Sequence, residues 1–325
     1  MTPFYNYTRD GITQGLLAKF LSCREETKLF LEGWTSKSSS SSALMFGNII
    51  HSCLERYYND IIKGSFKNKF QHNYFSYTSK LISTVEKFYT SRYAGHDTET
   101  YRILGVSFAI AEATLPHYFA RWSKDDTSKI KWQGLEQQFR IPFETKNGKK
   151  TFLRGKKDGT FTNPGLWLFE TKTKSQINEG NLIDTLWFEH QVNFYIYAML
   201  KIYKKYPSGV LYNIIRRTSL ERKTKESLQQ FISRISADIE KRLDFYFIRY
   251  EVALTKTDID SWKIQLEGMV QDFVDWYDKT IPHYRNTTNC ITKYGRCPML
   301  PICSSQNYHF YKKRKNVYEE LEEAL

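Results

Sequence analysis

Two carboxylates and an ammonium group lie close together in the middle of this sequence. Asp158 precedes a glycine, and Glu170 and Lys172 are separated by one residue. Two converging carboxylates form an oxygen-rich site for a hard divalent ion such as Mg²⁺. A neighbouring ammonium group can orient a water molecule or offset negative charge in a transition state. The E-x-K pattern alone is also common in ordinary surface ion pairs, so the elements that carry these residues decide between the two interpretations.

The elements around these residues read as a β-hairpin. Two runs rich in β-forming residues, 151–161 and 166–172, flank the turn sequence TNPG. Residues two apart on a strand project from the same face, so we expect Glu170 and Lys172 to point the same way. If the strands pair, Asp158 lies across from Glu170. The hairpin therefore predicts convergence of the two carboxylates.

Hydrophobic periodicity predicts the elements on either side of the hairpin. Helices are expected over 12–34, 43–62, 74–94, 101–122, 183–203, 224–243 and 257–277, and strands from Trp132 and over 209–217 and 245–254. The first helix contains Cys23, and the second carries His51. The serine run 36–42 between them predicts a mobile loop.

Charge and composition point to a polyanionic partner. The formal net charge is +13, and aromatic residues make up 16% of the chain. Nucleic acid is the first candidate for a protein this basic. An anionic membrane surface is the rival, but the sequence shows no basic amphipathic helix suited to it. No apolar run approaches the ~20 residues of a membrane helix. The N-terminal residues lack a secretory signal pattern, so we expect an intracellular protein. The chain has no Walker A motif, so we expect no helicase motor on it.

Three cysteines near the end of the sequence have a spacing typical of ligands. Cys290, Cys297 and Cys303 form a C-x6-C-x5-C array, and the total of five cysteines is odd. An odd number in a reducing compartment argues against a disulfide framework. Thiolates suit both zinc and iron–sulfur clusters, and the spacing leaves both open.

Several motifs together resemble the RecB-type branch of the PD-(D/E)xK nuclease superfamily. They are G-x-x-D-G ending at Gly159, the E-x-K at Glu170, a Q-x-x-x-Y from Gln191 to Tyr195, and a G-x-x-x-H ending at His51. The resemblance implies an α/β fold with a restriction-endonuclease-like central mixed sheet flanked by helices, a helical insertion and an Fe–S-bound C-terminal region. It implies one nuclease domain, with a largely helical part (12–131), a catalytic α/β core (132–285) and a cysteine-bearing region (286–325).

The resemblance also implies an activity, metal-dependent hydrolysis of DNA, most readily as an exonuclease. Asp158, Glu170, His51 and the main-chain carbonyl of Thr171 would hold Mg²⁺ or Mn²⁺, and imidazole suits Mn²⁺ better. Lys172 would position the attacking water.

Four further residues are expected to hold DNA. In the family, the positions of Gln191 and Tyr195 lie beside the active site. Arg216 and Arg217 belong to a basic cluster after a predicted strand, and we expect them to contact phosphates. The segments 212–217 and 246–249 also resemble phage-type members of the family.

The cysteine array resembles the cluster motif of RecB-type iron–sulfur nucleases, including the CRISPR adaptation nucleases. Those proteins take a fourth cysteine from near the N-terminus, which makes Cys23 the fourth ligand of an expected [4Fe–4S] cluster with Cys290, Cys297 and Cys303. The x6 step is longer than the one common there, and zinc is the alternative. Cys53 has no counterpart and is expected to be a buried thiol.

The expected partner is DNA, single-stranded or with free ends, and a homo-oligomer or a helicase or recombination partner is also possible for such a protein. The expected location is the cytoplasm of a bacterium or of a phage-infected cell, and the expected process is DNA replication, recombination, repair or phage DNA processing. A competing hypothesis is a non-cleaving DNA-binding or assembly subunit built on the nuclease fold.

Overall fold

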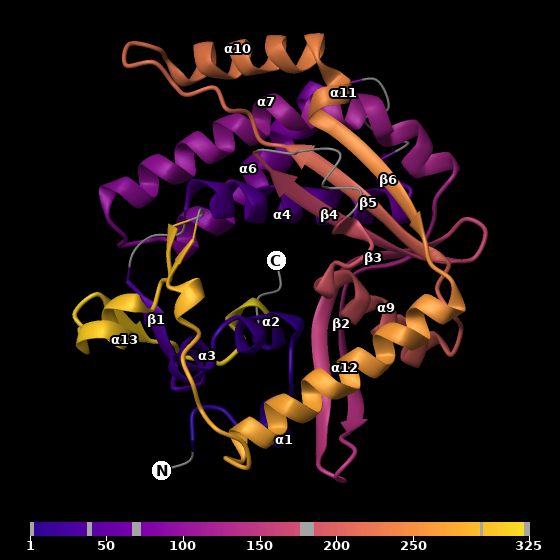
Figure 1. Ribbon diagram of the computed structural model, residues 1–325. Helices are drawn as coiled ribbons and strands as arrows, with labels where there is room; N and C mark the ends of the chain where they lie inside the picture. The colour runs from indigo at the N-terminus through magenta and orange to yellow at the C-terminus, as the bar shows by residue number, and fades with distance from the viewer. Residues whose placement is uncertain (1–2, 38–40, 67–72, 176–184, 293–294, 322–325) are drawn as a thin grey trace.

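The protein is built around a five-stranded mixed sheet (Figure 1). The computed structural model describes residues 3–37, 41–66, 73–175, 185–292 and 295–321. The sheet has the order β2-β3-β4-β5-β6, formed by β2 (Lys131–Glu144), β3 (Lys150–Thr162), β4 (Leu166–Lys174), β5 (Gly209–Arg216) and β6 (Phe247–Ala253). Strands β4 and β5 are parallel, and the other neighbours are antiparallel. The expected central mixed sheet flanked by helices is confirmed.

Helices cover both faces of this sheet, each over its own hydrophobic core. One face carries α4 (Ser42–Ile62), α6 (Tyr74–Arg92), α7 (Thr98–Ser128) and α10 (Leu228–Lys241). The other carries α2 (Gln14–Ser22), α9 (His190–Tyr203) and α12 (Lys256–Tyr277). Strand β5 is buried along its whole length, because alternate side chains enter the two cores. Tyr212 and Ile214 belong to one core, and Leu211 and Ile215 to the other.

Helix α7 is joined to the sheet by a buried ion pair. Arg249 Nη1 on β6 lies 2.7 Å from Asp126 Oδ1 on α7, and both side chains are almost inaccessible to solvent. Arg249 also donates to Asn213 Oδ1 on β5 and to the hydroxyl of Tyr118 on α7. A buried charge pair needs such additional hydrogen bonds to offset its desolvation. The network therefore fixes the position of the helical part against the strands.

Within the described residues, α7 is also long and apolar enough to span a membrane by length and composition alone. However, 67% of its most apolar window is buried inside the protein. That burial is typical of a core helix, and here α7 packs against α4, α6 and α10.

The N-terminal and C-terminal parts of the chain pack against each other. The N-terminal part contains α1 (Tyr7–Asp10), α3 (Arg24–Leu31) and β1 (Trp34–Ser36). The later elements are α11 (Leu243–Tyr246), η1 (Thr287–Asn289), β7 (Ile291–Thr292), β8 (Gly295–Arg296), α13 (Leu300–Ser305), β9 (Tyr311–Lys313) and η2 (Glu319–Leu321). Strand β1 pairs antiparallel with β9, and α13 lies next to β1 (Figure 1).

The predicted helix over 12–34 is wrong in one respect, because it is two helices. Cys23 lies between α2 and α3 with an extended backbone, at φ −160° and ψ 122°. The following residues start a new helix, with Glu25 and Glu26 in its first turn, where the helix dipole favours negative charge. Cys23 is therefore a junction residue, and its side chain is not fixed on a helix face.

Two other predicted helices are shorter than expected. The helix predicted over 183–203 is interrupted: residues 185–186 are helical, a turn follows at residues 187–188, and α9 begins at His190, while residues 183–184 lie outside the described part. The helix predicted over 224–243 spans Leu228–Lys241, because Ser227 and Gln230 form a capping box at its start. Within the predicted serine loop, Ser36 belongs to β1 and Ser42 begins α4, while residues 38–40 lie outside the described part.

Candidate active site

The two predicted carboxylates, Asp158 and Glu170, lie where strands β3 and β4 stop pairing with each other. Strands β3 and β4 pair from Thr162 and Leu166 as far as Gly159 and Phe169. Beyond that point β3 continues beside β2, and β4 continues beside β5. Asp158 and Glu170 are the next residues on the two diverging strands. Asp158 Oδ2 accepts a hydrogen bond of 2.7 Å from the backbone N–H of Thr171, which fixes the aspartate against β4.

Lys172 lies within contact distance of Glu170, as the strand period predicts. Its Nζ is 2.9 Å from Glu170 Oε1 and 3.0 Å from Glu189 Oε1, and it donates a 2.6 Å hydrogen bond to Gln191 Oε1. Gln191 Nε2 in turn donates to the hydroxyl of Tyr195 at 3.2 Å. The start of α9 thus holds the lysine in place, and the Q-x-x-x-Y motif is part of the same site.

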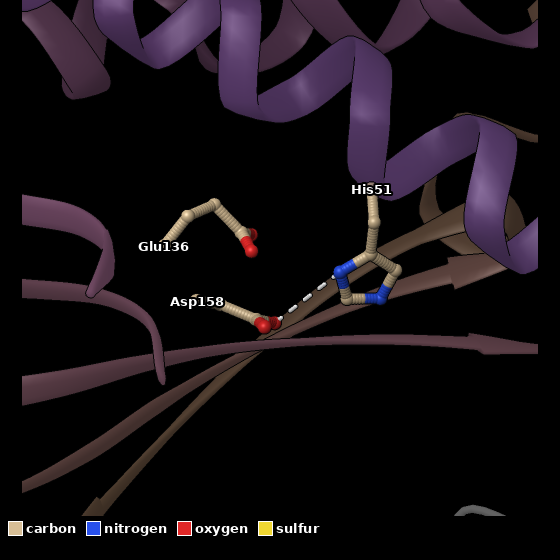
Figure 2. Close-up of side chains that lie close together, drawn as sticks. All are labelled: His51, Glu136 and Asp158. Atoms are coloured by element: carbon tan, nitrogen blue, oxygen red, sulfur yellow. Dashed lines mark ion pairs between the residues drawn. The ribbon is translucent and has the colours of Figure 1, made fainter. Parts of the chain in front are cut away.

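Helix α4 brings His51 to this site because Gly47 allows a close approach. A Cβ at Gly47 would lie 2.9 Å from Thr173 Oγ1 on β4, closer than real Cβ contacts. With no side chain there, one turn later His51 Nδ1 reaches to 3.6 Å from Asp158 Oδ2 (Figure 2).

A third carboxylate, Glu136, completes a group that sequence reasoning missed. Ligand atoms of His51, Glu136 and Asp158 all lie within 4.8 Å of one another (Figure 2). Glu136 sits on β2 with φ 46°, an uncommon backbone conformation for a residue with a side chain. Its carboxylate lies 2.6 Å from Lys156 Nζ on β3. No motif marks it in the sequence; the only signal is an acidic residue inside a predicted strand.

Glu170 carries an oxygen that suits a cation. The side chain is 1% exposed, and its Oε2 is buried without a hydrogen-bond partner among the residues that the structure describes. Leaving a buried carboxylate oxygen unpaired is costly, so such an atom calls for a partner. Carboxylates together with one imidazole are a donor set that suits Mg²⁺ or Mn²⁺. The residues present therefore fit a divalent metal ion.

The carboxyl groups hold protons more tightly than usual. Burial raises the pKa of Asp158 to about 6, although the Thr171 N–H and Lys172 oppose the shift. Burial and the charge of Asp158 raise the pKa of Glu170 to about 7, and the same two causes raise that of Glu136 to about 7. Such clustered, perturbed carboxyl groups are typical of functional sites.

The pKa values of the two basic groups of the site, His51 and Lys172, are shifted in opposite directions. Burial lowers the pKa of His51, so its imidazole is neutral and able to bind a metal. Burial also disfavours the charged form of Lys172, but Glu170 and Glu189 outweigh it and raise its pKa, so the ammonium group stays charged.

The site opens into a cavity of about 560 Å³. His51, Asp158, Gln191 and Tyr195 line it, as does Glu136. Four predicted site residues from three separate stretches of sequence therefore share one cavity, with Lys172 bonded to its wall through Gln191.

The two predicted DNA-binding arginines lie elsewhere. Arg216 is 6% exposed, donates through Nε to the carbonyl of Phe245 at 2.9 Å, and stacks on the Phe245 ring. Arg217 is half-buried and donates to Ser42 Oγ at the start of α4. Neither is among the described residues that line the cavity. Their contact with DNA stays a prediction, and Arg216 has a structural contact of its own.

The four predicted cluster cysteines gather where the two ends of the chain meet. The backbone N–H of Asn286 donates to Cys23 Sγ at 3.4 Å, which ties the α2–α3 junction to the C-terminal region. Burial raises the pKa values of the Cys297 and Cys303 thiols, and Cys23 and Cys290 add to both shifts. Cys53 is buried in α4, as expected.

Comparison with known proteins identifies the family. The family model of the PD-(D/E)XK nuclease superfamily matches residues 16–304, which is most of the chain. This chain belongs to the PD-(D/E)XK nuclease superfamily.

Among solved structures, the crystal structure of SSO0001 is similar to this chain. The two are 13% identical, with a TM-score of 0.31 over 78% of this chain and 97% of the other. A search of curated proteins finds no significant match.

Proposed function

We propose that this protein is a metal-dependent deoxyribonuclease that hydrolyses phosphodiester bonds, acting as an exonuclease. The observation that carries the proposal is the unpaired, buried Oε2 of Glu170 beside Asp158 and Lys172. A site that had lost its chemistry would have no reason to keep an unsatisfied buried carboxylate oxygen next to two further carboxyl groups. This argues against the competing hypothesis of a non-cleaving subunit.

The position of each residue determines its proposed role. Asp158, Glu170, His51 and Glu136 would hold Mg²⁺ or Mn²⁺, and the carbonyl of Thr171 is a further candidate ligand. A bound ion of this kind polarises the scissile phosphate and lowers the pKa of a water molecule. Lys172, fixed by Glu189 and Gln191, would orient that water and offset negative charge on the phosphate oxygens. Gln191 and Tyr195, on the cavity wall, would contact the DNA strand.

The test is cleavage of end-labelled single- and double-stranded DNA, with and without Mn²⁺. Asp158→Asn and Glu170→Gln should each reduce cleavage at least 100-fold while DNA binding and melting temperature are kept, because metal binding is lost and the fold is not. The control Glu221→Gln changes an exposed carboxylate and should cleave normally.

Undiminished cleavage by folded Glu170→Gln protein would contradict the mechanism. Binding of DNA without cleavage by the unaltered protein, under any divalent metal, would favour the non-cleaving subunit instead. Products released one nucleotide at a time from a labelled end support exonuclease action, and internal fragments contradict it.

Cys23, Cys290, Cys297 and Cys303 hold a [4Fe–4S] cluster in this proposal. The contact between Cys23 and Asn286, which brings the α2–α3 junction to the C-terminal region, supports a shared site. Four cysteines are the usual complement of such a cluster, and zinc is the alternative.

The cluster is tested by the colour and metal content of protein purified without oxygen. We expect brown protein with iron and acid-labile sulfide. Cys23→Ser should bleach it and lower its melting temperature, because the cross-link between the two ends is removed. The matched control Cys53→Ser should stay brown. Colourless protein with one zinc would show that the alternative metal is correct, and a brown Cys23→Ser protein would exclude Cys23 as a ligand.

DNA that is single-stranded or has free ends is the proposed substrate. Action in replication, recombination, repair or phage DNA processing, in the cytoplasm of a bacterial or phage-infected cell, belongs to the same proposal, as does a homo-oligomer or a helicase partner.

A further inference from the structure

The active-site cavity adjoins two others. A second cavity of about 410 Å³, here called the helical cavity, lies between α4 and α6 and shares Glu55 with the active-site cavity. A third of about 200 Å³, the terminal cavity, lies between residues 4–10 and 315–318 and shares Arg154 with it. Because a shared residue lines both members of each pair, the three cavities are neighbours in a row, with the metal-binding group in the middle one.

Basic side chains occur in all three cavities. They are Arg56, Lys63 and Lys80 in the helical cavity, Arg92, Arg154 and Lys156 in the active-site cavity, and Arg9 and Lys315 in the terminal cavity. Outside the metal-binding group, the acidic residues are fewer: Glu55, Asp60, Asp10 and Glu319. Two of these four carboxylates already have partners within the protein. Asp60 accepts hydrogen bonds from Ser65 and Tyr77, and Asp10 pairs with Arg9.

One basic group in the helical cavity has an unmet hydrogen-bonding need. Arg56 Nε is buried and has no hydrogen-bond partner among the described residues. A buried guanidinium N–H without a partner is costly, and a phosphate oxygen is its preferred partner. A phosphate oxygen in the helical cavity would give this N–H a partner.

The volume of the active-site cavity favours a single strand. The residues that line the active-site cavity include Phe88 on α6 and Tyr93 just after it, residues 13–15, and Glu319 and Leu321. Its volume is that of a pocket for a small molecule, whereas duplex DNA has a major groove that is itself about 12 Å wide. Phe88 and Tyr93 line this cavity and are partly exposed, so their rings can stack on bases, the usual means of holding single strands.

We propose that one DNA strand runs along this row, from the helical cavity through the active site to the terminal cavity. The inference rests on the proposed nuclease function and adds the path of the substrate and the residues that bind it. Phosphates contact Arg56 and Lys63 at one end and Arg154 and Lys315 at the other, with the scissile bond at the metal site between them.

The two ends of the path can be tested separately by charge reversal. In the inactive Glu170→Gln background, Lys63→Glu and Lys315→Glu change exposed lysines in the helical and terminal cavities. The control is Lys241→Glu, at an exposed lysine of α10, which packs on the outer side of α7 (Figure 1). All three changes alter the net charge equally, so differences between them report position.

Binding of fluorescent single-stranded oligonucleotides is measured by anisotropy. For a 20-nucleotide strand, each path variant should bind at least five-fold more weakly than the control. The slope of log affinity against log salt should become shallower by about 0.7 for each phosphate that the variant no longer neutralises. A four-nucleotide strand covers less of the path, so each path variant should weaken its binding less than that of the 20-nucleotide strand. Equal affinity of either path variant and the control for the long strand would overturn the continuous path.

Cleavage of a small chromogenic nucleotide phosphodiester separates this inference from the proposed function. With Glu170 restored, the control Lys241→Glu should cleave this small substrate as fast as the unaltered protein, because Lys241 lies outside the three cavities. A protein that binds the strand along the path but cleaves neither substrate would disprove the nuclease proposal and leave the path intact. A protein that cleaves both, with path variants no weaker than the control, would disprove the path alone.

Discussion

The carboxyl groups of the active site carry an energetic cost when no metal is bound. Asp158, Glu170 and Glu136 have raised pKa values because they are buried close together. Between about pH 4.5 and pH 7 the folded protein keeps protons that an unfolded chain has already released. The free energy of unfolding of the metal-free protein therefore falls as the pH rises through this window. A divalent ion replaces those protons and removes the repulsion.

This linkage predicts a pH-dependent effect of metal on stability. Mn²⁺ should raise the melting temperature more at pH 8 than at pH 5.5, because protons compete with the ion at the lower pH. Cleavage should likewise decline as the pH falls from 7 to 6. Thermal melts with and without Mn²⁺ at both pH values measure the effect, and Asp158→Asn should abolish the difference. An equal shift at both pH values would mean that the ion binds elsewhere.

Residues that are neighbours in sequence were predictable, and those placed by distant contacts were not. The positions of Asp158, Glu170 and Lys172 follow from strand alternation and a turn. Glu136 lies on β2 between residues that pair with Gly159 and Lys157, so the strand register brings it to Asp158, and no local pattern in the sequence gives that register. Arg216 looks like part of a solvated basic run, but its guanidinium packs on an aromatic ring about thirty residues later in the chain.

At the scale of elements, the contact between α4 and β4 determines whether His51 reaches the metal site. Gly47 is the point of closest approach, and Thr173 is the residue it faces. The sequence predicted α4 within one residue of its observed start, because its apolar periodicity is strong. It could not predict the distance between helix and strand, which depends on pairs of residues far apart in sequence. The break at Cys23 was missed for a related reason: neither glycine nor proline marks it.

Gly47→Ala should weaken metal binding by moving α4 away from β4. The added Cβ would meet Thr173 Oγ1 at 2.9 Å, so the helix or the threonine must shift. The double variant Gly47→Ala/Thr173→Ala should recover, because the obstructing oxygen is gone. Mn²⁺ affinity, measured by calorimetry, reports the effect.

Gly105→Ala in α7 is the matched control. A Cβ there meets no atom within 4 Å, so the change should stabilise the protein by about 0.5–1 kcal/mol through helix propensity. Unchanged Mn²⁺ affinity in Gly47→Ala would show that the close approach is not required for the site.

At the scale of the whole molecule, the net charge of +13 predicts strong salt dependence of DNA binding. Affinity of the inactive Glu170→Gln protein for a 20-nucleotide single strand should fall with a log–log slope of about −0.7 per phosphate neutralised. Anisotropy titrations between 50 and 200 mM salt would measure it. A flat response would mean that the basic surface has another partner.

The position of Glu319 and Leu321 at the active site has a consequence for the stage of synthesis at which the site is complete. Glu319 and Leu321 line the active-site cavity, and the carbonyl of Leu321 accepts a hydrogen bond from Gln138 on β2. A ribosome makes the chain from its N-terminus, so His51, Asp158 and Glu170 emerge long before these residues do. A nascent chain can form its central sheet, but its cavity lacks one wall until synthesis has passed Leu321. A cavity with this wall thus requires a chain that extends through Leu321, and shorter nascent chains expose an incomplete site.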